Sequence, residues 1–342
     1  RPGWHDVQVA LTGPAVDDVA LTFAERWEDP TPLDTRSIFR WLLHKFSRQP
    51  AKRSDLAAGR INSPKVGPHA VQVLRTYPVR RKPYPFAPEG ERSIAREYIK
   101  VFARSRSLIY LEDQYLWSAA ASDALCTALR REPNLLIVIV IPRYPDPSGR
   151  IAGAASILGR KRVQDALYAA GGERVAIYDL EREDGTAVYV HSKACIVDDV
   201  WLAVGSDNLN RRSWTHDSEL SCAIIDETLD EREPRDPAGL GDGARKLARD
   251  TRLRLAVEHT CAAFDVRQMV DPRQWFDTLR ISAEVLDQWH RNDDGGPRPP
   301  GHLRPHTIDR VNNAQRHLLG WVHSYVLDPD GRPTRLKRTN SY

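Results

Sequence analysis

The stretch that decides the fold is residues 188–225, VYVHSKACIVDDVWLAVGSDNLNRRSWTHDSELSCAII. Its first part is apolar and rich in β-branched residues, which predicts a strand containing His191 and Lys193. Side chains two positions apart on a strand leave the same face, so the imidazole and the ammonium should project together. Asp198 lies five positions after Lys193, and we therefore expect it in the turn, in a structural role.

Two further apolar runs follow within the same stretch. The second strand, around 200–204, leads into Gly205, where the absence of a side chain would let the backbone approach a ligand closely. A third strand begins at Glu219. If the three strands pair in chain order, one edge of the sheet collects a set of five candidate site residues: His191, Lys193, Ser206, Asn208 and Glu219.

This set of side chains suits a phosphodiester. An imidazole can act as a nucleophile or as a general acid near neutral pH. Lys193 would balance phosphate charge, while the amide of Asn208 and the hydroxyl of Ser206 would donate hydrogen bonds to non-bridging oxygens. Glu219 can hold the second nitrogen of His191, which would fix the tautomer and stabilise the cation.

The same residues carry a family resemblance. HSKACIVD (191–198) fits the HxKxxxxD, or HKD, signature of the phospholipase D superfamily, and GSDNLNRRS (205–213) resembles the GSxNxxxRS segment that follows it. Glu219 falls where that family has its histidine-orienting glutamate. Residues 1–27 resemble the end of the first half of a two-HKD phospholipase D, and IYLEDQYLW (109–117) resembles the strand that begins the second half.

The resemblance implies a layered α/β/α fold with a mostly parallel mixed sheet, together with a remnant of the first half. Helical patterns alternating with apolar strands favour the same class. We expect residues 1–68 to be the end of the first half, 69–265 the HKD domain and 266–342 a C-terminal extension. A helix is expected over 35–47, an exposed tail from about residue 292, and an amphipathic piece over 314–326.

The net charge and the apolar runs of the sequence indicate which partners and which location to expect. A formal charge of +4 over 342 residues is mildly basic, which would favour anionic head groups or nucleic acid without demonstrating either. The longest apolar run, 135–142, is too short to span a bilayer, so a cytoplasmic or peripheral membrane location is favoured. The chain begins with Arg1 rather than methionine, which leaves a targeting peptide upstream open.

The four cysteines are scattered, which favours buried thiols over a disulfide framework or a zinc site, and no metal or cofactor is expected.

The resemblance implies an active site formed between two HKD halves that face one another. One histidine attacks phosphorus to form a phosphohistidine, and the other protonates the leaving alcohol. This sequence has one HxKxxxxD, and the resemblance makes His191 the general acid/base, so the chain alone would be half of a site. His5 has no lysine two positions later and is expected to brace the structure. Glu112 and Gln114 share a strand face and would either line the cleft or form hydrogen bonds in the core.

Three explanations of the single motif stay open. The chain is the C-terminal part of a longer two-HKD enzyme, or one copy of a homodimer like the single-HKD nucleases, or a non-catalytic lipid- or protein-binding remnant. The missing half or a second copy is therefore one expected partner. A phospholipid substrate at a membrane surface is favoured over nucleic acid, because no interleaved aromatic and basic stripe is evident. The head group, and the choice between hydrolysis and transfer of the cardiolipin- or phosphatidylserine-synthase kind, stay open.

Overall fold

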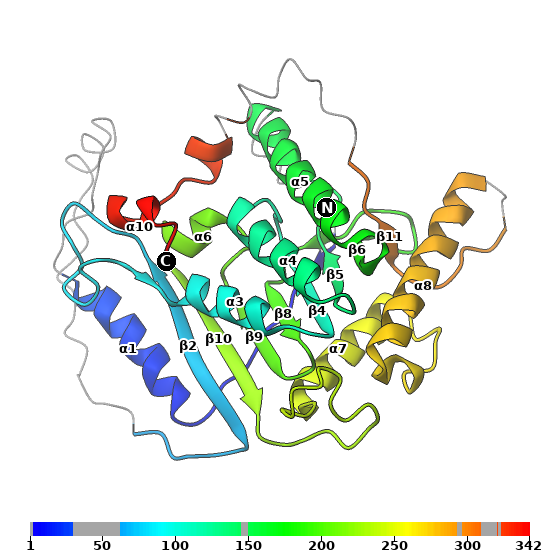
Figure 1. Cartoon of the computed structure of the whole chain (residues 1–342), viewed down its shortest axis with the longest axis horizontal. Coiled ribbons are helices and arrows are strands. Elements are labelled where there is room, and N and C mark those ends of the chain that lie inside the picture. The colour runs from blue at the N-terminus through cyan, green and yellow to red at the C-terminus, as the bar shows by residue number, and fades with distance from the viewer. Residues whose placement is uncertain (1–2, 30–61, 145–149, 293–295, 309–319, 321–322) are drawn as a thin grey trace.

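The computed structural model describes residues 3–29, 62–144, 150–292, 296–308, 320 and 323–342 (Figure 1). The helix expected over 35–47 and most of the amphipathic piece over 314–326 lie outside these residues. None of the described helices is both long enough and apolar enough to cross a bilayer.

One large sheet dominates the described residues, with two short strands beside it. The strands, in chain order, are β1 (Trp4–His5), β2 (His69–Tyr77), β3 (Glu91–Arg92), β4 (Leu108–Glu112), β5 (Leu136–Val140), β6 (Val175–Leu180), β7 (Tyr189–Val190), β8 (Ala194–Val197), β9 (Trp201–Gly205), β10 (Glu219–Asp226) and β11 (Leu303–Pro305). The large sheet has the order β11-β6-β5-β4-β8-β9-β10-β2-β3, and β1 pairs with β7 separately. The three strands expected from residues 188–225 thus pair in chain order as β8, β9 and β10.

Helices cover both faces of the sheet, as Figure 1 shows. They are α1 (Ala15–Glu28), α3 (Ser93–Arg104), α4 (Ala119–Arg131), α5 (Arg150–Gly171), α6 (Arg211–Thr215), α7 (Lys246–His259), α8 (Pro272–Asn292) and α10 (Thr334–Arg338). Alternation along β4 shows the layering, because Ile109 and Leu111 pack with α3, α4 and α5, whereas Leu108 and Tyr110 pack with α7 and α8. The expected α/β/α layering is therefore confirmed.

The expectation of a mostly parallel sheet is wrong. Strands β4, β5 and β6 are parallel neighbours, joined by the crossover helices α4 and α5. The other six of the eight neighbouring pairs in the described sheet are antiparallel. The tight turn between β8 and β9 can join only antiparallel strands. Three other antiparallel pairs, β4 with β8, β10 with β2 and β11 with β6, join strands that are distant in the chain. The sheet is mixed, with its parallel part confined to the centre.

Asp198 and Asp199 form the turn between β8 and β9, as expected. Both have positive φ angles, 53° and 56°, which is the backbone of a type I′ hairpin turn. Asp198 accepts hydrogen bonds from the backbone amides of residues 106, 107 and 108, which tie the turn to the start of β4. Burial raises the pKa of Asp198 to about 6 against these three hydrogen bonds. The aspartate of the HKD signature is structural.

The exposed appendage that we expected beyond residue 292 is not what the described residues 296–308 form. Strand β11 pairs antiparallel with β6 and so forms an edge of the large sheet, with Leu303 fully buried. Helix α8 places Trp275, Phe276 and Leu279 in the same apolar layer as α7. Helix α8 ends where this tail begins, and Leu303 of β11 belongs to the same apolar layer as the buried residues of α8.

Candidate active site

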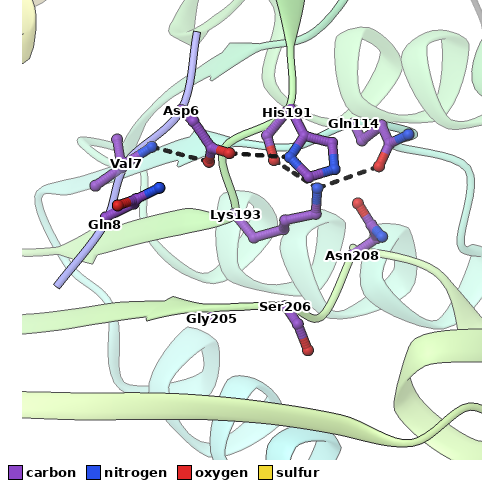
Figure 2. A pocket seen from close by; sticks show the side chains of 9 residues that line it. All are labelled: Asp6, Val7, Gln8, Gln114, His191, Lys193, Gly205, Ser206 and Asn208. Atoms are coloured by element: carbon purple, nitrogen blue, oxygen red, sulfur yellow. Dashed lines mark hydrogen bonds and ion pairs between the residues drawn. The ribbon is translucent and has the colours of Figure 1, made fainter. Parts of the chain in front are cut away.

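A pocket of about 420 Å³ opens at the edge of the sheet where β4 and β9 end and β8 begins (Figure 2). The residues that line it are Asp6, Val7, Gln8, Gln114, His191, Lys193, Gly205, Ser206 and Asn208. Four of the five side chains expected from the sequence are therefore together. Glu219 is not among the lining residues and lies behind Ser206, with which it forms a hydrogen bond.

His191 and Lys193 lie in a break between two strands rather than inside one. The two-residue strand β7 ends at Val190 and β8 begins at Ala194, yet the two side chains enter the same pocket, as the spacing of two predicts. The imidazole of His191 is about one third exposed, and its Nδ1 lies 3.0 Å from a carboxylate oxygen of Asp6. Nδ1 is thereby occupied, which leaves Nε2 for a substrate.

The carboxylate that holds His191 is Asp6, and the expectation that Glu219 does so is wrong. Asp6 follows β1, which pairs in parallel with β7, so that Trp4 lies opposite Tyr189 and His5 opposite Val190. This pairing brings residues 185 positions apart in the chain into contact. The sequence of residues 188–225 contains no information on this contact, because its partner lies outside that stretch. The sequence offered one indication of the contact, the aspartate beside His5 in the segment that resembles the end of the first half.

Lys193 is a buried cation, with 6% of its surface exposed. Its Nζ donates to Oε1 of Gln114 at 3.1 Å and to the backbone carbonyl of His191, which uses two of its three N–H groups. Burial lowers the pKa of Lys193, and the negative charges of Asp113, Asp6 and Glu219 oppose the change. The third N–H group is available to an anion in the pocket.

Asn208 and Ser206 complete the polar lining. Asn208 is 8% exposed, and its side-chain oxygen is buried without a hydrogen-bond partner among the described residues. That oxygen can only accept hydrogen bonds, so the NH₂ group of the same amide is the part that could donate to an anion in the pocket. The hydroxyl of Ser206 is exposed and donates to Glu219.

Gly205 lines the pocket and is also required by the packing of the sheet. A Cβ built on it would lie 1.8 Å from Oγ and 2.7 Å from Cα of Ser221 on the neighbouring strand β10. A close approach that requires glycine is therefore found between these two strands.

Part of the chain that carries this pocket is similar to a known protein family. Residues 98–232 match the family model described as "Cardiolipin synthase, PLD-like domain", and this range includes Gln114 and all five of the expected site residues. The chain contains a phospholipase D-like domain.

Curated relatives of the chain are phospholipases D. Phospholipase D1 of Cricetulus griseus is 28% identical over 268 residues, which are 66% of this chain and 25% of the relative. Phospholipase D A of Dictyostelium discoideum is 30% identical over 294 residues, which are 76% of this chain and 21% of the relative. The chain thus spans about a quarter of the length of the curated relatives it matches.

Among solved structures, matches include a phospholipase D family member, Nuc, from Salmonella typhimurium, with 19% identity and a TM-score of 0.31 over 46% of this chain and 84% of that one. Another is phosphatidylserine synthase from Haemophilus influenzae, with 16% identity and a TM-score of 0.36 over 46% of this chain and 35% of that one.

Burial raises the pKa of two carboxyl groups near Lys193, those of Asp207 and Glu219. Burial raises the pKa of Asp207 to about 7, against a hydrogen bond donated by Ser221. Burial also raises the pKa of Glu219, against hydrogen bonds with Ser206 and Ser213. Both groups lie close enough to Lys193 for their charges to act on its pKa.

The two strand residues that we expected either to line the cleft or to bond in the core divide between these roles. Gln114 lines the pocket, accepts from Lys193 and donates to the hydroxyl of Tyr189 at 2.6 Å. Glu112 is 1% exposed and lies in the core, in contact with His5 and His259.

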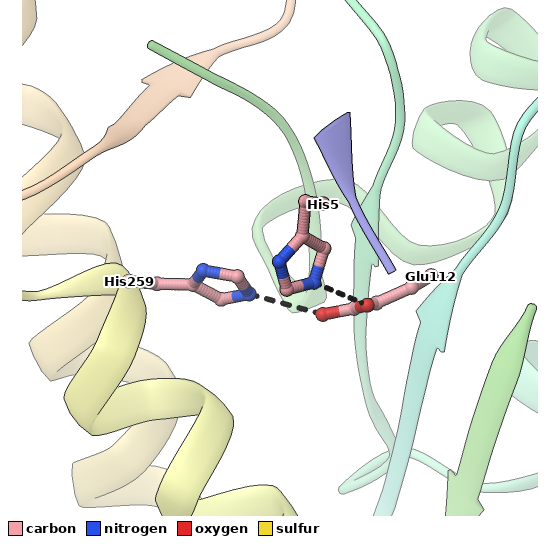
Figure 3. Close-up of side chains that lie close together, drawn as sticks. All are labelled: His5, Glu112 and His259. Atoms are coloured by element: carbon pink, nitrogen blue, oxygen red, sulfur yellow. Dashed lines mark hydrogen bonds and ion pairs between the residues drawn. The ribbon is translucent and has the colours of Figure 1, made fainter. Parts of the chain in front are cut away.

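His5, Glu112 and His259 form the one cluster in the described part of the chain whose ligand atoms could surround a metal ion, all lying within 4.8 Å of one another (Figure 3). Both histidine Nε2 atoms are already 2.8 and 3.0 Å from the two oxygens of Glu112. A hydrogen-bonded network satisfies these groups without a metal. The cluster braces the structure, as expected for His5.

Proposed function

We propose that the phospholipase D-like domain provides one half of a phosphodiesterase site that cleaves the head-group phosphodiester of phospholipids. The observation that carries the proposal is the pocket in which His191, paired with Asp6, lies beside the buried cation of Lys193 and the side-chain amide of Asn208. A cation and an amide NH₂ group that can donate hydrogen bonds together favour an anion with several oxygens.

His191 is proposed as the general acid/base. With Nδ1 held by Asp6, Nε2 would deliver a proton to the leaving alcohol and later take one from the attacking water or alcohol. Asp6 would stabilise the imidazolium that is present before the first of these events and forms again at the second. Lys193 and Asn208 would stabilise negative charge on the non-bridging oxygens, with Ser206 at the exposed rim of the pocket.

The nucleophile in this proposal is a second histidine outside the motif of this chain. It would attack phosphorus, displace the alcohol and form a phosphohistidine, which water or an acceptor alcohol then resolves. The contact of Asp6 with His191 supports a site assembled from both halves, because residues 1–68 are proposed to end the first half. The missing half would come from the same reading frame, with a second copy of the chain as the alternative.

The test is an assay of the complete reading frame with three phosphodiester substrates. Phosphatidylcholine vesicles would be supplied with and without ethanol, single-stranded DNA would be supplied separately, and bis-(p-nitrophenyl) phosphate would report any diesterase activity. We expect choline release from the vesicles, phosphatidylethanol when ethanol is present, and little cleavage of DNA.

Each outcome bears on a named alternative. Cleavage of DNA without lipid turnover would replace the proposal with a nuclease. Phosphatidyl transfer without hydrolysis would assign a synthase-like role. Loss of all three activities in a folded complete protein would favour a binding remnant.

A further inference from the structure

The segment that carries Asp6 to His191 has two faces with different tasks. Because the backbone is extended, Trp4 and Asp6 share one face, and both contact His191. The centroids of the Trp4 and His191 rings are 4.8 Å apart, and Asp6 binds Nδ1 of His191. His5 lies between them and points the opposite way, with 8% of its surface exposed. Its carbonyl accepts hydrogen bonds from the backbone amides of His191 and Ser192 at 2.8 and 3.3 Å.

The ring of His5 is held on both sides. Nε2 lies 2.8 Å from Glu112 on β4, and Nδ1 lies 3.0 Å from Glu258 on α7. The second oxygen of Glu112 accepts from the hydroxyl of Tyr110 and contacts Nε2 of His259, so the carboxylate is satisfied on both oxygens (Figure 3). His5 thereby joins the segment to a strand of the sheet and to a helix.

His5 carries a positive charge at neutral pH. Burial acts to lower the pKa of His5, but the hydrogen bonds with Glu112 and Glu258 outweigh burial and raise the pKa to about 10. Two carboxylates therefore face one buried imidazolium, and this is a charge-assisted arrangement with two fixed donors. It orients the ring more firmly than packing alone would.

We propose that His5 is a positioning residue for His191: anchored by Glu112 and Glu258, it fixes the segment from which Asp6 reaches Nδ1. The inference rests on the proposed function only in taking His191 as the acid–base group. No comparison or motif assigns His5 this role, and its effect would pass to the pocket through Asp6.

The test measures which nitrogen of the His191 ring carries the proton, and this measurement does not require enzymatic activity. In ¹⁵N NMR of the histidine-labelled chain, at a pH where the ring is neutral, the wild type should hold the proton on Nδ1, facing Asp6. Asp6→Ala should shift the proton toward Nε2. His5→Gln should shift it in the same direction, and the double variant His5→Gln/Asp6→Ala should match Asp6→Ala alone.

A second variant protects the test if His5→Gln fails to fold. Glu258 has 54% of its side chain exposed, so Glu258→Ala removes one anchor without leaving an unpaired charge in the core. It should produce a smaller shift in the same direction. Glu284→Ala, which removes a comparably exposed helical glutamate from α8, is the matched control and should leave the His191 tautomer unchanged.

Three results would overturn the proposal. One is a folded His5→Gln chain with the wild-type tautomer. Another is a shift in the double variant that exceeds the shift of Asp6→Ala, because His5 would then act independently of Asp6. The third is one equivalent of zinc in the purified wild type that is lost in His5→Gln, because a metal rather than a paired imidazolium would then form the anchor.

The kinetics of phosphodiester turnover by the complete protein provide a separate test of the role of His5. His5→Gln should lower kcat by about 10- to 100-fold with little change in KM, because a small misplacement of a catalytic group costs on that order. If the NMR result holds while no phosphodiester is turned over, the positioning role stands and the proposed function fails.

Discussion

Lys193 and His191 are held by different parts of the chain, although they are two residues apart. Lys193 is buried and bound to Gln114, which follows β4, whereas His191 is about one third exposed and bound to Asp6 of the N-terminal segment. The cation is therefore fixed by the domain itself, and the imidazole depends on a distant segment. The roles of the two side chains can be tested separately for this reason.

Lys193→Met in the complete protein should lower kcat by about 10²–10³-fold. The change keeps most of the side-chain volume and removes one preorganised charge at the phosphoryl oxygens. Lys193→Arg should not restore activity, because a planar guanidinium cannot replace a point charge held between Gln114 and a backbone carbonyl. Choline release measures both. Lys100→Met, at a side chain that is 77% exposed, is the control, and equal rates in the Lys193 and Lys100 variants would remove Lys193 from the site.

At this scale the sequence predicted the members of the site better than their contacts. The spacing of two in His191 and Lys193, and again in Ser206 and Asn208, correctly placed four side chains in one pocket. It could not place Asp6, because a parallel contact between β1 and β7 depends on the fold of the whole chain. Glu219 was assigned to His191 from the expected strand pairing and from the resemblance, and the structure pairs it with Ser206.

Among the elements, the turn between β8 and β9 depends most on buried charge. Asp199 is fully buried and is bound by Arg249 and Arg252 of α7 at 2.6–2.8 Å, and Arg252 also donates to the carbonyls of residues 269 and 270. This network fastens α7 to the strand pair that carries the HKD motif. It also holds the turn in its left-handed backbone conformation.

Arg252→Leu should lower the free energy of unfolding by about 3–5 kcal/mol, because it leaves a buried carboxylate with one of its two partners. Denaturant unfolding followed by tryptophan fluorescence measures the change. Arg254→Leu, at an exposed position of the same helix, should stay within about 0.5 kcal/mol of the wild type. Equal midpoints for the two variants would show that the network does not stabilise the fold.

The anchor of the N-terminal segment should also show in the pH dependence of stability. Because the pKa of His5 is raised from its ordinary value to about 10, its contribution is fully present below pH 6.5 and is lost as the pH rises through about 10. Urea midpoints of the wild type and His5→Gln, measured from pH 6 to 10.5, should therefore converge toward the alkaline end. A difference that stays constant over this range would contradict a charged His5.

For the whole molecule, the layers were predictable and the strand directions were not. Apolar strands alternating with helical patterns predict α/β/α layering, because each face of such a sheet must be covered. Strand direction depends on which connections are tight turns, and strand β11 depends on pairing with β6 more than a hundred residues earlier. The sequence between β10 and β11 does not by itself reveal the direction of the strands or the pairing of β11 with β6.

The site of the whole molecule is proposed to need a second histidine. The described pocket has one histidine, His191, among its lining residues. We therefore expect residues 1–342 alone to turn over phosphatidylcholine at least about 10³-fold more slowly than the complete protein, since the nucleophile would be missing. Choline release by the two proteins at equal concentration measures this. Comparable rates, with a first-order dependence on the concentration of residues 1–342, would show that this chain is sufficient as a monomer.

The most direct measurement is the rate of choline release from phosphatidylcholine vesicles by the complete protein, as wild type, His191→Asn and His69→Asn. His69 lies at the far end of β2 and serves as the matched control. We expect His191→Asn to fall by at least about 10³-fold, in the range for loss of a general acid/base, and His69→Asn to match the wild type. Turnover by His191→Asn within a few-fold of the wild type would contradict the account.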